Sequence, residues 1–424
     1  MMDVHNKQNT TIWLSCLLIT SVYLNAYHIN VGFSLKPYMI ISAFIFMMVF
    51  YKFRIHKLRL FEVSLLFFFI FYCATGIYAR YPLDSIRLIV AIILVLIVYF
   101  IMRFIFSAIS IKELEKAILL SGIGFNVLSL ALFAFGAYTL GFDFVGNGVR
   151  AYGILLDRGV PRLIGTFSDP NIFAFGNFLF FYYYVTHLKE KGAKLGLLLS
   201  ATTLLLTFSR GAYLAVLLGG LLLFLTAKAK TKMKIMLLGP PILYVLILAA
   251  SKLFNMDIVK IVGDRFSEST TDSGSGRFEI WENGLKLFTD NPVFGIGIYN
   301  YRAYSNALFN NDHYMHNTFL EVLTESGVIG FTLYLIVFVW VFYDFYIHRN
   351  SAIDIRYLFA TFVSMLLFMS SLSLVASEVF FLIMAVIWRY LYEIERNRKQ
   401  VLPPRQSSLA HIWRPESEAV KYKD

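Results

Sequence analysis

The sequence is poor in charge, in cysteine and in the short motifs that bind nucleotides or metals. Only 15% of the 424 residues are charged, whereas soluble domains have about 25%. The two cysteines, Cys16 and Cys73, both lie in apolar runs, which argues against a disulfide framework or a thiolate metal site. The chain has no Walker-type phosphate loop, no HExxH motif and no Asp-x-Asp pair. We therefore predict no metal and no cofactor, and expect any group donor to be lipid-linked rather than a nucleotide sugar.

Apolar side chains, by contrast, are abundant. Hydrophobic residues make up 58% of the chain, and the mean hydropathy is +0.65. Because a transmembrane helix needs about 20 mainly apolar residues, the sequence predicts an all-α polytopic membrane protein with twelve spans. The first resembles a signal peptide, but it follows a single lysine and lacks a small-residue cleavage site, so we interpret it as a span. The predicted spans are 11–27, 37–51, 60–79, 85–106, 117–140, 171–187, 194–208, 211–227, 234–254, 319–347, 357–375 and 377–395.

The distribution of positive charge predicts the topology. The net charge of +11 would suggest nucleic acid in a soluble protein, but lysine and arginine set orientation in a membrane protein, and no nucleic-acid partner is expected. Positive residues cluster after the second, fourth, sixth, eighth and tenth predicted spans and in the tail, which places these connections and both termini in the cytoplasm. We expect helices and an external loop over 1–163, a membrane core over 164–395, and a cytoplasmic tail over 396–424.

The connections on the opposite side carry mostly arginine. A guanidinium group binds phosphate through two parallel hydrogen bonds, whereas lysine is a point charge. The excess of arginine therefore predicts an anionic ligand at the outer face; the alternative is contact with lipid headgroups and local pairing with aspartates. These arginines are Arg80, Arg87, Arg150, Arg158, Arg162, Arg210, Arg265, Arg277 and Arg302.

The longest polar segment, 255–318, is predicted to be a large extracytoplasmic loop that contains short helices. A loop of this length in a compact protein is either functional or disordered. Its many aromatic residues, such as Trp281 and Tyr299, argue against disorder. We therefore expect this loop to carry the chemistry, with Arg265, Arg277 and Arg302 as candidate anion ligands.

Two arginines stand at predicted helix starts. Arg277 follows a Gly-Ser run and precedes an amphipathic segment, Phe278 to Phe288, which Ser275 could cap. A helix N-terminus there would favour an anion; the alternative is an interfacial helix with its aromatic face in the headgroups. Arg210 lies between two closely spaced spans, where the alternative is a snorkelling arginine at a tight turn.

His316 stands where the polar loop meets the tenth predicted span. A histidine at such a boundary can exchange a proton near neutral pH; the alternative is a hydrogen-bonded structural residue. Asn317 and Glu321 follow it, and we expect Glu321 and Glu325 on the wetter side of the helix. His313, three residues before His316, could be a second ligand of a metal ion, but the sequence offers no third ligand.

The sequence Asp169-Pro170-Asn171 opens the sixth predicted span. An aspartate cap with proline at the first helical position accounts for it without a function. The nearby Arg162 keeps a substrate-binding role for Asp169 and Asn171 open.

Taken together, the motifs resemble those of the O-antigen ligase and lipid-linked polysaccharide polymerase superfamily. TFSRG at 207–211, GSGR with the following tryptophan and NPVFGIGIYNY at 274–301, and HNTFLEVLTESGVIG at 316–330 carry the resemblance. GTFSDPN at 165–171 looks like the exopolysaccharide-polymerase members and favours polymerase over ligase. The resemblance covers roughly residues 160–345.

The resemblance implies a GT-C-like, metal-independent, inverting glycosyltransferase of the bacterial cytoplasmic membrane. Such an enzyme transfers a glycan from undecaprenyl pyrophosphate to a sugar hydroxyl of a glycan or glycolipid acceptor on the outer face of the bilayer. The products are O-antigen, capsule or exopolysaccharide, and other polysaccharide assembly proteins are candidate partners. His316 would be the general base, and Arg210 and Arg277 would bind the pyrophosphate. We expect substrate contacts from Arg162, Asp169, Asn171, Arg265, Arg302, His313, Asn317 and Glu321.

The alternative reading is a transporter or flippase of lipid-linked oligosaccharides. Transporters commonly show internal repeats and ionisable residues near the bilayer midplane. The sequence shows no such repeat, and the ionisable residues of the predicted spans lie near span ends. This distribution favours an enzyme that acts at one surface.

Overall fold

The computed structural model describes residues 2–31, 34–254, 256–271 and 276–401. It is mostly helical, at 72%, and a helix lies over each of the twelve predicted spans. The α-helices are α1 (Met2–Val22), α2 (Pro37–Val49), α3 (Leu60–Ala74), α4 (Pro82–Ser107), α5 (Ile111–Thr139), α6 (Pro170–Thr186), α7 (Ala193–Leu206), α8 (Arg210–Thr226), α9 (Ala229–Phe254), α10 (Ile258–Thr271), α11 (Arg277–Asp290), α12 (Tyr301–Phe309), α13 (Thr318–His348), α14 (Arg356–Met369) and α15 (Glu378–Val401). Short 3₁₀ turns, η1 (Phe50–Lys52) and η2 (Thr75–Ile77), follow α2 and α3.

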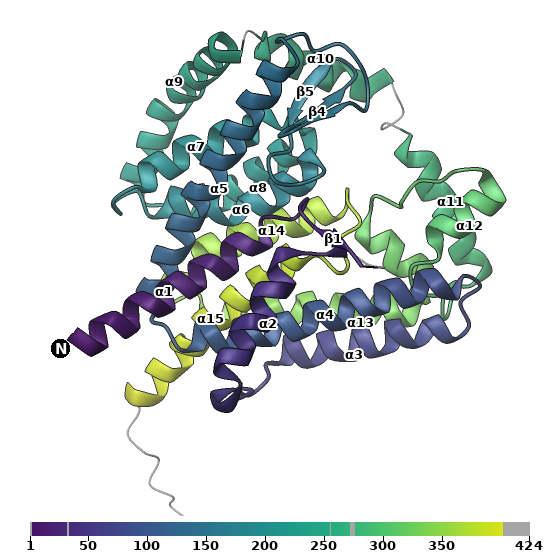
Figure 1. The fold of residues 1–424 in the computed structure, drawn as a ribbon, viewed down its shortest axis with the longest axis horizontal. Helices are drawn as coiled ribbons and strands as arrows, with labels where there is room; N and C mark the ends of the chain where they lie inside the picture. Colours follow the sequence, from purple (N-terminus) through teal and green to yellow (C-terminus); the bar gives the residue numbers. More distant parts are fainter. Residues whose placement is uncertain (1, 32–33, 255, 272–275, 402–424) are drawn as a thin grey trace, which may run out of the picture.

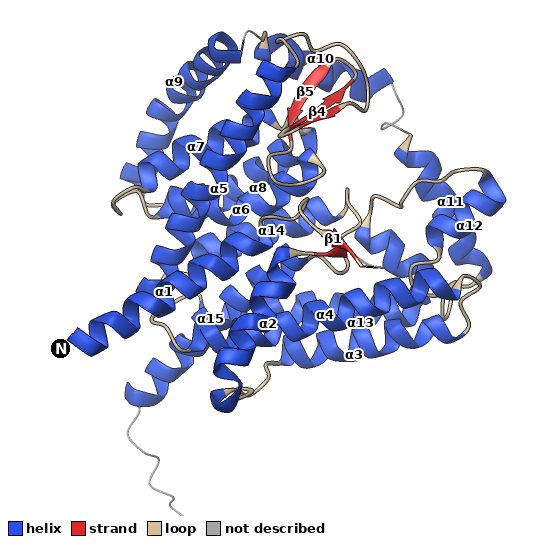
Figure 2. Ribbon diagram, viewed as in Figure 1, coloured by secondary structure: helices blue, strands red, loops and turns tan. Residues whose placement is uncertain are grey.

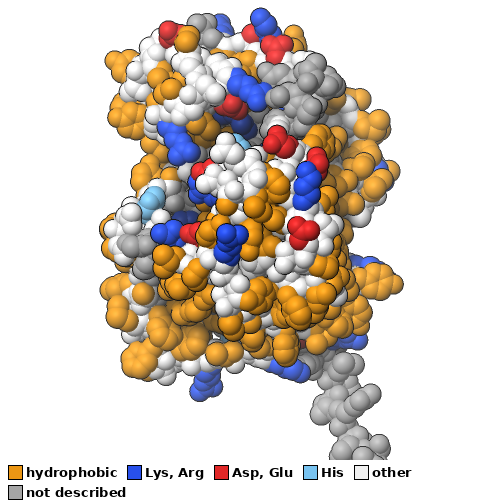
Figure 3. All heavy atoms as spheres, turned by 90° about the vertical axis from the view of Figure 1, so that its right-hand side faces the viewer, with side chains coloured by type: hydrophobic (Ala, Val, Ile, Leu, Met, Phe, Trp, Pro, Cys, Tyr) orange, Lys and Arg blue, Asp and Glu red, His pale blue; other side chains and the backbone are white. Residues whose placement is uncertain are grey.

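The apolar helices fit an all-α membrane protein. Among the described residues, five helical segments are long and apolar enough to cross a bilayer: Leu60–Ile77, Pro82–Ser107, Ile111–Thr139, Ala229–Phe254 and Thr318–His348. Shorter apolar helices are Ile12–Val22, Pro37–Met48, Ala193–Leu206, Arg210–Thr226 and Arg356–Met369. The number of crossings, twelve, stays a prediction. Seen towards α11 and α12, charged side chains gather mainly over the upper half of the molecule, while hydrophobic ones dominate below (Figure 3).

The helices pack in two groups that are joined through α2, α14 and α15. In one group α13 lies along α3, and α15 lies along α4; in the other α1 packs on α5, and α6 packs on α7 (Figure 1). Helix α14 packs on α6 and α8. Helices α11 and α12 lie at one edge of the molecule, near the ends of α3 and α13 (Figure 1). Helix α15 runs to Val401, so the predicted tail begins as helix, and residues 402–424 of that tail lie outside the described residues.

Two small antiparallel sheets were not predicted from the sequence. One pairs β1 (Ile29–Asn30) with β2 (Ser34–Leu35), and the other has the order β3 (Arg150–Ala151), β4 (Ile154–Asp157), β5 (Val160–Leu163) (Figure 2). Between β4 and β5, Arg158 and Gly159 both have positive φ, of 54° and 72°, as the tight hairpin turns of twisted strands require. This hairpin brings Arg162 to the start of α6, as described below.

Helix α13 is interrupted at Gly327, which has φ 63° and ψ −169°. Around the interruption, α13 is hydrogen-bonded to the segment before α12. The backbone N–H of Ile296 donates to the carbonyl of Thr324 at 3.1 Å, and the backbone N–H of Gly297 donates to the carbonyl of Glu325 at 3.0 Å. A side chain at 327 would overlap the carbonyl of Val293. The motifs at 291–301 and 316–330 therefore form one packed unit, and this unit supports the candidate site.

Candidate functional site

His316 lies in the loop between α12 and α13 and is half-buried. Its φ of 50° is unusual for a residue with a side chain. Asn317, which follows, caps α13, because its side-chain oxygen accepts hydrogen bonds from two backbone N–H groups of the first turn. Met315, which precedes it, accepts a 3.1 Å hydrogen bond at its carbonyl from the indole of Trp281. The backbone of His316 is therefore held on both sides, and the structure gives Asn317 a capping role.

Helix α11 packs on α13. Phe278 and Leu285, on its apolar face, are 59% and 44% exposed, as the alternative of an interfacial helix requires. The buried residues are Ile280, Asn283, Gly284 and Leu287. The face that packs on α13 therefore consists partly of small and polar residues, and the aromatic pattern does not identify it. Trp281, at the edge of the buried face, provides the hydrogen bond to Met315.

Arg277 is the first residue of α11, and Gly276 stands at the N-cap position with φ 73°. The predicted cap, Ser275, lies outside the described residues. Burial and the positive charge of Arg210 lower the pKa of the Arg277 guanidinium, while the carboxylate of Asp169 acts in the opposite direction. Arg210, Asp169 and Arg277 therefore lie within electrostatic range of one another.

Arg210 is the first residue of α8. Ser209 caps this helix by accepting a hydrogen bond from the N–H of Ala212 at 3.2 Å, and its own hydroxyl donates to the side-chain oxygen of Asn171 at 2.7 Å. Arg210 and Arg277 thus both open a helix. Because a helix N-terminus carries a partial positive charge, both helices reinforce the positive potential of their arginines.

The side chain of His316 is close to the same charges. Burial lowers the pKa of its imidazole, the positive charges of Arg277 and His313 lower it further, and the negative charge of Asp169 opposes them. A histidine with a lowered pKa is neutral at pH 7, and a neutral imidazole can accept a proton. Asp169 and Arg277 therefore lie within electrostatic range of His316, and Arg210 lies within electrostatic range of Arg277.

Arg162 and Asn171 are tied into a network beside this site. The Arg162 guanidinium donates to the carbonyl of Thr207 at 2.9 Å and to the side-chain oxygen of Asn171 at 3.1 Å, and it pairs with Asp157 at 3.1 Å. These contacts connect β5, the start of α6 and the turn that leads to Arg210. They give Arg162 and Asn171 a supporting role, and direct contact with a substrate stays a prediction.

Asp169 caps α6, which confirms the capping interpretation of the sequence. One of its carboxylate oxygens accepts hydrogen bonds from the N–H groups of Asn171 at 2.7 Å and Ile172 at 3.1 Å. The same side chain acts electrostatically on Arg277 and His316. The cap therefore also holds a negative charge near the two positive groups.

The expectation that Glu321 and Glu325 face water is wrong. Their exposed fractions are 6% and 1%. Glu325 accepts hydrogen bonds from the backbone N–H groups of Tyr299 at 2.7 Å and Tyr301 at 3.1 Å, and from the hydroxyl of Tyr72. A polar helix face can thus point inward, because it satisfies the backbone of a neighbouring loop. A substrate contact from Glu321, one turn before Glu325, stays a prediction.

Of three other predicted residues, one forms an ion pair elsewhere, one acts on His316 through its charge, and one has a side chain outside the described part of the structure. Arg302 makes a two-pronged ion pair with Asp312, with both nitrogen–oxygen distances at 2.7 Å. His313 is exposed, and its charge acts on both His316 and Asp312. The side chain of Arg265, a residue of α10, lies outside the described part of the structure.

Sequence reasoning missed the residues that hold the base rather than those proposed to react. Trp281 and Glu325 both stood in the motifs, but their hydrogen bonds to Met315 and to the 299–301 backbone depend on tertiary contacts. The available signal was that a tryptophan and a glutamate occur in two polar motifs that flank the same loop.

The family model for O-antigen ligase matches residues 195–335, from α7 into α13, and this range contains Arg210, Arg277 and His316. No curated protein matches the chain. This part of the chain is therefore similar to the O-antigen ligase family, and the mostly helical fold with its membrane-compatible helices agrees with that similarity.

Proposed function

We propose that this protein is a membrane glycosyltransferase that takes a glycan from undecaprenyl pyrophosphate and joins it to a sugar hydroxyl of an acceptor. The reaction takes place on the outer face of the bacterial cytoplasmic membrane, during polymerisation or ligation of a surface polysaccharide. The observation that carries the proposal is the electrostatic link between a half-buried histidine with a lowered pKa and the helix-opening Arg277, which in turn lies within electrostatic range of the helix-opening Arg210.

In the proposed reaction, neutral His316 accepts the proton of the acceptor hydroxyl as its oxygen attacks the anomeric carbon of the donor. The new glycosidic bond forms while the bond from the anomeric carbon to the pyrophosphate oxygen breaks, and the pyrophosphate leaves with the electron pair. Arg210 and Arg277 stabilise the negative charge that develops on it. A single displacement inverts the anomeric configuration, and the leaving group is good enough for positioning and charge stabilisation to suffice.

Asp169 has a defined part in this scheme. Its negative charge acts to raise the pKa of His316, so it stabilises the imidazolium that forms when the base has taken the proton. It also offsets part of the mutual repulsion between Arg210 and Arg277 when no pyrophosphate is bound. The carboxylate is held by its capping contacts in α6 and does not need to contact the substrate.

The contacts of the charged residues within the helices support an enzyme over a flippase. Glu62 and Arg103 are both buried and form an ion pair at 2.8 Å between α3 and α4. Arg59, before α3, pairs with Asp344 of α13 at 3.3 Å. Arg389 donates to the carbonyl of Ile109 at 2.7 Å. These groups join helices to one another, so they have a structural explanation that needs no transport path.

The test is reconstitution of the purified protein with an undecaprenyl-pyrophosphate-linked repeat unit. We expect glycan transfer that persists in EDTA and is lost in His316→Ala, with His28→Ala, which changes an exposed histidine just before β1, as the control. A ladder of products would identify a polymerase, and a single adduct on a second lipid would identify a ligase. Full activity of His316→Ala would refute the proposed base. Lipid-linked glycan that crosses the bilayer without any transfer would instead support the flippase.

A further inference from the structure

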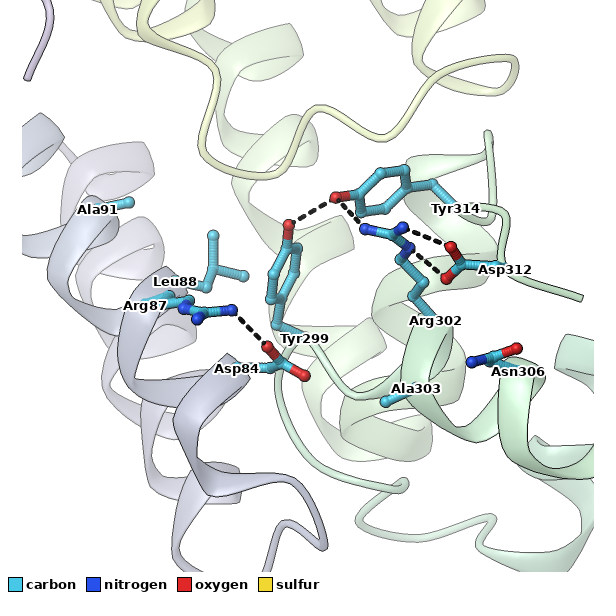
Figure 4. A pocket seen from close by; sticks show the side chains of 10 residues that line it. All are labelled: Asp84, Arg87, Leu88, Ala91, Tyr299, Arg302, Ala303, Asn306, Asp312 and Tyr314. Atoms are coloured by element: carbon cyan, nitrogen blue, oxygen red, sulfur yellow. Dashed lines mark hydrogen bonds and ion pairs between the residues drawn. The ribbon is translucent and has the colours of Figure 1, made fainter. Parts of the chain in front are cut away.

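A cavity of about 410 Å³ opens between α4 and α12, apart from the residues of the arginine and histidine site. Its volume falls in the range of about 300–1,000 Å³ that is typical of small-molecule sites. The lining comes from the start of α4, from α12 and from the loops on either side of α12 (Figure 4). The lining residues are Asp84, Arg87, Leu88, Ala91, Tyr299, Arg302, Ala303, Asn306, Asp312 and Tyr314.

The charges of this cavity are already neutralised. Arg87 pairs with Asp84 at 3.0 Å, and Arg302 pairs with Asp312 through two nitrogen–oxygen contacts of 2.7 Å (Figure 4). An anion such as pyrophosphate would have to displace a carboxylate from one of these arginines. The cavity therefore suits an uncharged ligand rich in hydroxyl groups, in contrast to the site around Arg277.

The remaining lining has the chemistry that binds a sugar ring. The hydroxyls of Tyr299 and Tyr314 lie 3.1 Å apart, and the Arg302 guanidinium stacks over the Tyr314 ring at 4.9 Å (Figure 4). An aromatic ring accepts the apolar C–H face of a pyranose, since its π face is electron-rich. Carboxylates, tyrosine hydroxyls and the amide of Asn306 can accept from or donate to the sugar hydroxyls. Both kinds of contact are present in one cavity.

The cavity wall is joined to the candidate site through the backbone. Tyr314 is two residues before His316, and the backbone N–H of Tyr299 donates to Glu325 at 2.7 Å. The wall is therefore fixed to the same segment of α13 that follows the proposed base. A glycan bound in the cavity would need to extend only a short way to place one of its own hydroxyls beside His316.

We propose that this cavity binds the acceptor glycan and that Tyr299, Tyr314, Asp312 and Asn306 recognise its sugar rings. The proposal rests on the proposed function for the identity of the glycan as acceptor, and it assigns donor and acceptor to chemically different places. The donor pyrophosphate occupies the positive site of Arg210 and Arg277, and the neutral sugars of the acceptor occupy the cavity with paired charges.

The test measures binding separately from transfer. The probe is the repeat-unit oligosaccharide without lipid or phosphate, titrated calorimetrically into the full-length protein in lipid nanodiscs. Ala303→Trp fills the cavity, and Ala307→Trp places the same side chain one turn further along α12, outside the lining. We expect Ala303→Trp to weaken oligosaccharide binding by about tenfold or more, because a blocked pocket loses its hydrogen bonds and its packing together. Ala307→Trp should bind as the wild type does.

Kinetics provide the second readout. In Ala303→Trp the KM for the acceptor should rise by a similar factor, while the KM for the lipid-linked donor and the kcat stay unchanged. Asn306→Ala, a milder change at an exposed position, should raise the acceptor KM in the same direction and guards against misfolding of the tryptophan variant.

Wild-type oligosaccharide binding by folded Ala303→Trp would overturn the proposal, as would an equal loss of binding to undecaprenyl pyrophosphate. The two proposals fail separately. A protein that binds the oligosaccharide in a manner sensitive to Ala303→Trp but transfers no glycan would refute the glycosyltransferase and keep the glycan site. A protein that transfers glycan with acceptor kinetics insensitive to both variants would refute the glycan site alone.

Discussion

The indole nitrogen of Trp281 donates a 3.1 Å hydrogen bond to the carbonyl of Met315, the residue immediately before His316. The donor belongs to α11, the helix that Arg277 opens. One helix thus carries both a candidate pyrophosphate ligand and the group that orients the backbone of the candidate base. Movement of α11 would change both positions together, so the geometry between the arginine and the histidine is kept by a single rigid element.

The first prediction concerns this hydrogen bond. Trp281→Phe keeps an aromatic ring and removes the N–H donor, so His316 loses the contact that fixes its preceding carbonyl. We expect kcat to fall by about tenfold to a hundredfold, because small displacements of a catalytic group cost up to about 10²-fold. The donor KM should stay within about twofold if Trp281 acts by positioning the base alone.

The control for this variant is Leu285→Ala, which changes an exposed apolar residue on the same helix and should leave the kinetics unchanged. If Trp281→Phe kept the wild-type kcat, the hydrogen bond would have no part in positioning the base.

The second prediction tests whether Arg210 and Arg277 bind the pyrophosphate through their two-pronged guanidinium groups or only through their positive charge. Arg210→Lys and Arg277→Lys keep the positive charge but cannot make two parallel hydrogen bonds to a phosphate. We expect each to lower kcat/KM for the lipid-linked donor by about tenfold or more, which corresponds to about 1.4 kcal/mol. Arg356→Lys, which alters an exposed arginine paired with Asp354, should have no effect. Normal donor kinetics in both variants would exclude direct contact with the pyrophosphate.

The third prediction follows from the lowered pKa of His316. Since the base must be neutral, the acidic limb of the kcat/KM profile should lie below the ordinary histidine pKa of about 6.5. Arg277→Gln removes a positive charge that lowers the pKa of His316, so the pKa rises and the acidic limb moves to higher pH. Asp169→Asn removes a charge that raises this pKa, so the limb moves to lower pH.

Two features make this pair of variants informative. Asparagine also caps helices well, so Asp169→Asn leaves α6 intact. Arg277→Lys keeps the positive charge and should leave the acidic limb of the kcat/KM profile in place. The acidic limb is measured under single-turnover conditions for each variant. Shifts of the same sign in Arg277→Gln and Asp169→Asn would show that another group titrates.

The apolar pattern of the sequence was sufficient to locate twelve of the fifteen described α-helices. Long apolar runs become helices in a bilayer because only a helix satisfies every backbone group internally, and each of the twelve predicted segments lies on a helix. The motifs also indicated which arginines and which histidine to compare: Arg277 lies within electrostatic range of both His316 and Arg210. Their roles in catalysis stay predictions.

Other features depend on contacts that no local pattern encodes. The β4–β5 hairpin has strands of four residues within a long loop, too short for an alternating pattern to stand out. Glu325 looked solvated because it recurs with Glu321 on one polar helix face, yet its partners are backbone N–H groups of a segment more than twenty residues away. Arg302 pairs with Asp312, ten residues away, a contact that the sequence pattern does not show, and an anion-binding role for Arg302 stays a prediction.

The last prediction concerns the interruption of α13. Gly327→Ala puts a side chain at a positive φ and against the carbonyl of Val293, so either α13 or the 291–301 segment must move. We expect a loss of more than about 2 kcal/mol of stability, from backbone strain together with the overlap. Thermal unfolding in detergent measures the loss, and transfer activity should fall with it, because the same segment holds the loop that leads to His316.

Gly124→Ala is the matched control, since Gly124 lies within α5 with open space around it and alanine is the better helix former there by roughly 0.5–1 kcal/mol. Equal unfolding midpoints for the two variants would mean that the contact between the motifs at 291–301 and 316–330 does not stabilise the fold.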